Sequence, residues 1–142
     1  MKALNTYLNF DGNARDAMEF YKTCLGAELV MMTFADSPMQ TPPGSEKRIM
    51  HARLSKGALT LMASDCMPGM PFQQGTNFSL AIECETPQEV DKLFAALSAG
   101  GKVIMPVQET FWANRFGMLT DKFGVNWMLD LEKPQQRVVD AA

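Results

Sequence analysis

Histidine is nearly absent from this chain, because His51 is the only one among 142 residues. A metal site or a mechanism that needs two histidines from one chain is therefore excluded. The three cysteines, Cys24, Cys66 and Cys84, form no CxxC pair, which excludes zinc-finger and thioredoxin-type sites. An odd number of widely spaced cysteines is typical of reduced thiols, so we expect a cytoplasmic protein without disulfides.

Basic runs and long apolar runs are also missing. Thirteen Lys and Arg residues oppose sixteen Asp and Glu residues, for a net charge of −3, and the lack of a basic stripe predicts no nucleic-acid partner. No stretch reaches the ~18 apolar residues of a membrane span. Residues 1–5 begin no apolar region of signal-peptide length. We therefore expect no membrane partner, and one domain or two half-domains.

A pattern of one strand, one helix and three strands is predicted in the first half. Asn13 is a candidate N-cap, helical apolar spacing follows it, and Gly26 is typical of a helix end. Lys56-Gly57 indicates a tight turn between the last two strands. The strands are expected over 4–10, 27–35, 48–55 and 58–64.

The same order is predicted again after residue 76. Thr86, Pro87 and Glu89 form a strong helix start, and Gly100-Gly101 ends that helix. The strands are expected over 77–84, 102–108, 115–121 and 125–131.

These patterns favour an α+β protein built from two tandem βαβββ modules, with Phe20-Tyr21 corresponding to Leu93-Phe94. A generic α+β domain with accidental symmetry is the alternative. The expected boundaries are a first module over 1–65, a Pro/Gly-rich linker over 66–76, a second module over 77–131, and a frayed tail over 132–142.

Three separated motifs resemble those of PhnB-like proteins in the vicinal-oxygen-chelate superfamily, which includes glyoxalases, bleomycin-resistance proteins and extradiol dioxygenases. They are residues 7–14 (YLNFDGNA), 108–113 (QETFWA) and 121–128 (DKFGVNWM). The resemblance implies a concave mixed sheet that holds a small molecule, commonly in a homodimer. Some such proteins are labelled methyltransferases, but no Gly-rich nucleotide loop follows a strand in this sequence.

The resemblance also implies where a divalent metal would bind, because metal-using members take ligands from the first, fourth, fifth and eighth strands. Those positions correspond to Asn5, Met62, Asn77 and Met128. Amides and thioethers are poor ligands for such ions, which prefer imidazole and carboxylate. We therefore expect the usual metal site to be lost, and these four residues to contact a ligand instead.

His51 is expected on the concave face. If Lys56-Gly57 is the turn, Ser55 pairs with Ala58 and His51 lies opposite Met62. An imidazole in that position can act as a general base or a metal ligand, or be a hydrogen-bonded surface residue. The side chains expected on this face are Ile49, His51, Arg53, Thr60, Met62 and Ser64.

Other candidates surround this face or lie in the loop over 109–114. Glu109 can accept a proton or bind a metal with His51, while Phe111 and Trp112 can form the wall of a ligand site or a dimer contact. Tyr7 can donate a hydrogen bond into the cavity. Arg53 and Arg115 can bind a carboxylate or phosphate. Loop packing and ordinary surface exposure are the alternatives for all of them.

Three functions remain open from the sequence. The first is small-molecule binding without a metal. The second is a metal-dependent lyase, isomerase or dioxygenase that uses a shifted site at His51 and Glu109. The third is a dimeric structural protein whose vestigial cavity is filled by side chains such as Met62 and Met128.

Overall fold

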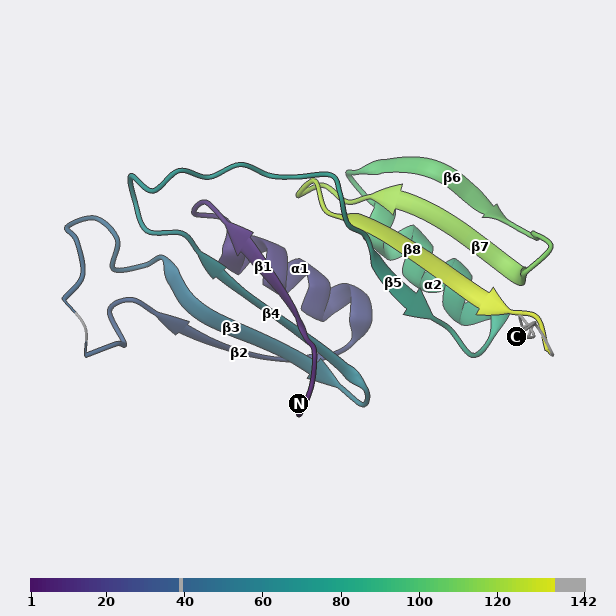
Figure 1. The fold of residues 1–142 in the computed structure, drawn as a ribbon, viewed down its shortest axis with the longest axis horizontal. Helices are drawn as coiled ribbons and strands as arrows, with labels where there is room; N and C mark the ends of the chain where they lie inside the picture. Colours follow the sequence, from purple (N-terminus) through teal and green to yellow (C-terminus); the bar gives the residue numbers. More distant parts are fainter. Residues whose placement is uncertain (39, 135–142) are drawn as a thin grey trace. The chain divides into compact units, whose positions relative to one another are not determined.

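The computed structural model describes residues 1–38 and 40–134. The chain divides into two compact units, Met1–Gln73 and Gln74–Ala142. In Figure 1 the helix of each unit lies along one face of that unit's own four-stranded sheet. The α+β class and the repeated strand–helix–strand–strand–strand order are therefore confirmed.

The first unit contains a mixed sheet in the order β1-β4-β3-β2. Strand β1 runs parallel to β4, and the other pairs are antiparallel. Its elements are β1 (Thr6–Phe10), α1 (Ala14–Leu25), β2 (Glu28–Thr33), β3 (Ile49–Lys56) and β4 (Leu59–Asp65).

Helix α1 buries a single face against the sheet. Ala17, Met18 and Tyr21 are completely buried, at helical spacing. Gly26 ends the helix with φ 62°, a left-handed conformation that glycine adopts without strain. Asn13 occupies the predicted N-cap position, but its side chain makes no capping hydrogen bond.

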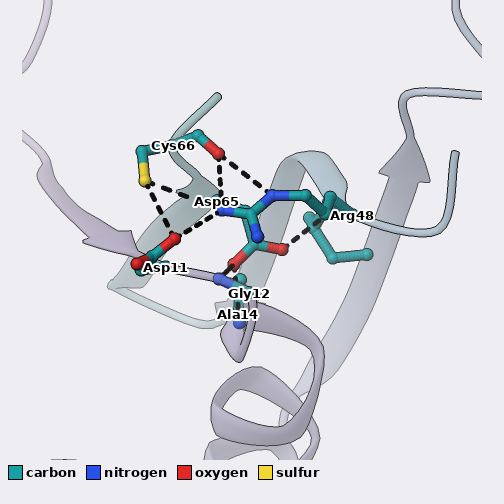
Figure 2. A network of polar contacts seen from close by, with 7 residues as sticks. Asp11, Gly12, Ala14, Arg48, Asp65 and Cys66 are labelled. Carbon is teal, nitrogen blue, oxygen red and sulfur yellow. Dashed lines mark hydrogen bonds and ion pairs between the residues drawn. The ribbon is translucent and has the colours of Figure 1, made fainter. Parts of the chain in front are cut away.

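The cap of α1 comes from Asp65, at the far end of β4 (Figure 2). One oxygen of this buried carboxylate accepts hydrogen bonds from the backbone N–H groups of Gly12 and Ala14, at 2.8 and 3.0 Å. The other oxygen accepts from the N–H of Ile49 at 2.8 Å. Asp65 therefore joins the helix start to the ends of two strands.

The β3–β4 hairpin is paired two residues away from the expected register. Lys56 pairs with Leu59, and Arg53 rather than His51 lies opposite Met62. Gly57, at φ 54°, occupies the first turn position, where tight hairpins require a positive φ. A shift of two residues preserves the face of every side chain.

A bulge in β3 changes the face of Ile49. Met32 pairs with His51 and Thr33 pairs with Ile49, which leaves Met50 as an extra residue on β3. Ile49 is consequently 1% exposed. Its expected place beside His51 is therefore wrong, since the inserted residue turns it toward the core.

The second unit contains a sheet in the order β5-β8-β7-β6. Strand β5 starts three residues later than expected, so Asn77 lies before the strand and is exposed. The elements are β5 (Leu80–Glu83), α2 (Pro87–Ser98), β6 (Lys102–Gln108), β7 (Ala113–Thr120) and β8 (Asn126–Glu132).

Local sequence accounts for the start of α2. The Thr86 hydroxyl accepts from the N–H of Glu89 at 3.1 Å, and the Glu89 carboxylate accepts from the N–H of Glu85 at 2.8 Å. Pro87 is in the first turn, as predicted. No described helix is long and apolar enough to cross a membrane.

The turn between β7 and β8 is organised by Asp121, which is 3% exposed. Its carboxylate accepts from the N–H groups of Phe123 and Val125 and, at 2.8 Å, from the indole N–H of Trp127. Trp127 is buried on the α2 side of the sheet. The Asp121 carboxylate therefore binds both the backbone of the turn and the buried side chain of Trp127.

Replacing Asp65 by Ala should destabilise the first unit by about 3 kcal/mol, because three backbone donors lose a charged acceptor. Urea unfolding with hydrogen exchange at Gly12, Ala14 and Ile49 measures the loss. The exposed Glu19 on α1 is the control, and Glu19→Ala should change stability by less than about 0.5 kcal/mol. Equal stability of the Asp65 variant and wild type would contradict the role of this carboxylate.

Candidate functional site

The face of the first sheet opposite α1 brings together four of the candidate residues. We call it the open face. Tyr7 pairs with Met62, and Met62 pairs with Arg53, so these side chains form one row across β1, β4 and β3. Val30 on β2 continues the row beside Arg53. Leu8, Leu54 and Leu61 alternate with this row and are buried toward α1.

His51 lies two residues along β3 from Arg53, on the same open face. Its Nδ1 atom is 3.3 Å from the Tyr7 hydroxyl, and the two ring centroids are 5.8 Å apart. When Nδ1 is unprotonated the Tyr7 hydroxyl donates to it, and Nε2 then carries the ring proton as a donor. This pair offers hydrogen bonds beside apolar surface.

Two apolar side chains of the open face are strongly exposed. Val30 is 72% exposed and Met32, which pairs with His51, is 41% exposed. Tyr7 is 42% exposed in the same row. Asn5 immediately precedes β1 and is exposed. The open face therefore offers a phenol, an imidazole and a guanidinium around apolar side chains.

The candidates in the second unit occupy two separate environments. Met128 lies on the sheet face opposite α2, paired with Ala81 and Met118. The Glu109 carboxylate forms an ion pair with Lys133, at 3.0 Å. Glu109 belongs to the second unit and His51 to the first, and the pairing of the two side chains stays a prediction.

The aromatic residues of the loop before β7 pack on one another. Phe111 meets Trp112 edge to face, with ring centroids 4.7 Å apart, and Trp112 meets Phe116 at 5.3 Å. Phe111 is 80% exposed, whereas Phe116 is buried. Loop packing therefore accounts for the position of Trp112, and Phe111 leaves most of its ring accessible.

The donor set does not fit the metal site that the family resemblance implies. Within residues 1–38 and 40–134, no three His, Cys, Asp or Glu side chains gather closely enough to hold a metal ion. The corresponding side chains are two amides, Asn5 and Asn77, and two thioethers, Met62 and Met128. Such groups bind hard and borderline divalent ions weakly.

Sequence reasoning missed a polar cluster formed by Asp11, Arg48 and Cys66 (Figure 2). One Arg48 nitrogen lies 2.8 Å from the Asp11 carboxylate and 2.7 Å from the Cys66 carbonyl oxygen. The hydrogen bond from Arg48 lowers the pKa of Asp11, and burial raises the pKa of the Cys66 thiol. The cluster ties the ends of β1 and β4 to the start of β3.

Carboxylates collect on the face of the second sheet opposite α2. Asp130 pairs with Glu83 across β5 and β8. Burial and the neighbouring Glu132 and Glu83 raise the pKa of Asp130. Arg115, a candidate anion-binding residue, instead forms an ion pair with Asp91 of α2, at 3.8 Å. The two sheets therefore present different chemistry on corresponding faces.

An open hollow of about 470 Å³ lies where α1 ends and the β3–β4 hairpin turns. The Lys56 ammonium group beside it donates to the carbonyl of Leu25 at 3.0 Å. None of the predicted catalytic or ligand-binding residues lines this hollow. It is lined by Gly26, Glu28, Ser55, Lys56 and Gly57.

Comparison with known proteins identifies relatives over nearly the whole chain. The family model described as 3-demethylubiquinone-9 3-methyltransferase matches residues 2–129. Protein YjdN of Escherichia coli (strain K12) is 38% identical over 144 residues, which cover 93% of this chain and 97% of the relative.

Solved structures of similar proteins also match nearly the whole chain. Protein PA1353 from Pseudomonas aeruginosa has a TM-score of 0.84 and 44% identity, covering 92% of this chain and 98% of that chain. A PhnB protein from Bacillus cereus has a TM-score of 0.76 and 31% identity, covering 92% and 99%. The fosfomycin resistance protein FosX from Listeria monocytogenes has a TM-score of 0.65 and 15% identity, covering 96% and 98%, which shows a shared fold.

Replacing Asp130 by Asn should stabilise the protein at pH 7. A pKa raised above its unfolded value means that folding disfavours the charged form, so stability is lost as the pH rises through the folded pKa. The melting temperature should rise by about 2 °C at pH 7, and this gain should vanish below about pH 3.5. The matched variant Asp91→Asn, which loses an ion pair, should show no rise. An equal gain at both pH values would contradict the electrostatic cause.

The Cys84 thiol should resist alkylation in the folded protein. Burial, together with the carboxylates of Glu89 and Asp130, raises its pKa to about 12. At pH 8 only about one molecule in ten thousand then carries the reactive thiolate. Mass spectrometry after iodoacetamide treatment should find Cys84 labelled in urea but unlabelled without it. Labelling at the rate of free cysteine in the folded protein would contradict this environment.

Proposed function

Because this chain belongs to the 3-demethylubiquinone-9 3-methyltransferase family of PhnB-like proteins, with the glyoxalase/bleomycin-resistance fold, we propose that it binds a small molecule on its open face without a metal ion. The observation that carries this proposal is the contact between Tyr7 and His51 beside exposed apolar side chains. The family description names methyl transfer, and that activity is not part of the proposal.

The chemistry of the open face supports binding. Tyr7 and His51 supply directional hydrogen bonds, while Met62 and Val30 supply an apolar surface in the same row. Ligand sites commonly combine mainly apolar walls with a few placed polar groups. The residues proposed to contact the ligand from this sheet are Asn5, Tyr7, His51, Arg53 and Met62. Within the second unit, the proposed ligand contacts are Asn77, Phe111, Trp112 and Met128.

A metal-dependent lyase, isomerase or dioxygenase at His51 and Glu109 is the second candidate function. The only imidazole of the chain lies on the open face, which favours it. The ion pair of Glu109 with Lys133 opposes it, because a carboxylate bound to an ammonium group is a weaker metal ligand. Metal analysis of the purified protein separates the two functions, since about one equivalent lost in His51→Ala would favour the enzyme.

A homodimer and a cytoplasmic location belong to the same proposal. Exposed apolar side chains such as Phe78, Val103 and Ile104 supply surface that a second copy can cover. None of the three cysteines forms a disulfide, which is consistent with a reducing compartment. Sedimentation equilibrium measures the oligomeric state directly.

Met62→Gln should weaken binding of the neutral fluorescent probe N-phenyl-1-naphthylamine about tenfold, because a polar amide replaces an apolar contact in the centre of the row. Met70→Gln is the matched control, because Met70 is 60% exposed and lies outside the sheets. This variant should bind the probe with the affinity of the wild type. Fluorescence titration measures affinity, and amide chemical shifts at Tyr7 and Met62 locate the probe.

Adding the chelator EDTA should leave the affinity of the wild-type protein for N-phenyl-1-naphthylamine unchanged, because the proposed site uses no metal ion. Probe-induced shifts confined to residues away from the open face would contradict the proposed site. Equal weakening by both methionine variants would contradict the role of Met62.

A further inference from the structure

The open face carries one permanent positive charge, that of Arg53. Arg53 is exposed, while its strand neighbours Ala52 and Leu54 are completely buried, so its side chain lies on the open side of the sheet. The other open-face positions are neutral except Glu28 on the edge strand and His51, whose charge depends on pH. They are Tyr7 and Asn9 on β1, Thr60, Met62 and Ser64 on β4, Ser55 on β3, and Val30 and Met32 on β2.

Within residues 1–38 and 40–134, Arg53 has no carboxylate at ion-pair distance, in contrast to Arg48 and Arg115. Arg48 forms an ion pair with Asp11 at 2.8 Å, and Arg115 forms one with Asp91 at 3.8 Å. Among the ion pairs of the described residues, none includes Arg53. Glu28 lies on the same face but pairs in register with Ser55, whereas Arg53 pairs with Val30.

The neighbours of Arg53 define an environment with separate polar and apolar parts. Met62 and Val30 flank Arg53 in its row, and Tyr7 lies beyond Met62. A guanidinium presents five N–H donors in a planar fork that matches the oxygens of a carboxylate, sulfonate or phosphate. An exposed cation beside apolar side chains therefore suits a molecule that has an acidic group attached to an apolar body.

We infer that the ligand of the open face is an organic anion, whose acidic group binds the Arg53 guanidinium and whose apolar body lies on Met62, Val30 and the Tyr7 ring. This inference rests on the proposed function, because it names the ligand class of that same face. His51, which pairs with Met32 beside the row, and Tyr7 within the row are placed to supply hydrogen bonds to polar atoms of the body.

Two fluorescent probes that differ by one acidic group test this inference. They are 1-anilinonaphthalene-8-sulfonate and N-phenyl-1-naphthylamine, which has the same ring system without the sulfonate. Arg53→Gln should weaken binding of the sulfonate probe about tenfold and change binding of the neutral probe less than twofold. Arg53→Lys should retain part of the affinity, since it keeps the charge but not the fork.

Arg15→Gln is the matched control, because Arg15 is an exposed arginine on α1. It should leave both affinities unchanged. Raising the salt concentration from 20 to 500 mM (about 25-fold) should weaken binding of the sulfonate probe to the wild type but not to Arg53→Gln. Melting temperatures of all variants verify that each is folded.

The outcomes separate the inference from the proposed function. If Arg53→Gln leaves sulfonate binding intact, or weakens both probes equally, the inference is wrong. If Met62→Gln nevertheless weakens binding of the neutral probe, the proposed function stands even though the inference about Arg53 is wrong. If neither probe shifts the amides of Tyr7 and Met62, both the proposed function and the inference fail.

Discussion

Three backbone N–H groups of the first unit depend on a single buried carboxylate, that of Asp65. It caps α1 through Gly12 and Ala14, and it holds the start of β3 through Ile49. The bulge follows at once, so that Ile49 enters the core while His51 emerges on the open face. An acceptor that fixes the strand start therefore also fixes where the imidazole can meet Tyr7. The position of the candidate site is a consequence of this anchor.

The second unit repeats the fold with different polar anchors and different chemistry. Helix α2 is capped by the adjacent Thr86 rather than by a distant strand, and Asp121 secures the β7–β8 turn. Its sheet face opposite the helix collects carboxylates around Asp130, whereas the open face of the first sheet carries Arg53. Because outward-facing side chains alternate with core residues, the two faces can differ in charge while both sheets keep the same alternation of apolar core residues.

Local patterns predicted the elements, and contacts between distant residues produced the errors. Gly26 and Thr86 lie at the helix ends where the sequence placed them, because their signals are contained in neighbouring residues. The cap of α1 comes from a residue 51 positions beyond Ala14, which no local pattern reveals. The bulge at Met50 likewise has no signal of its own. The hairpin register was wrong by two residues, yet His51 and Arg53 kept their face, since side chains alternate with a period of two.

Binding without a metal ion must draw on modest terms, and their sizes indicate the affinity to expect. Covering about 100 Å² of apolar surface around Met62 and Val30 contributes about 2.5 kcal/mol. A charge-assisted hydrogen bond to Arg53 and a neutral one to the Tyr7–His51 pair add about 3 kcal/mol together. These terms total about 5.5 kcal/mol, and the ligand's lost translational and rotational freedom offsets part of that gain, so we expect weak binding. The acidic group therefore supplies a large share of the affinity, which makes charge the first property by which this face can select among molecules of similar shape.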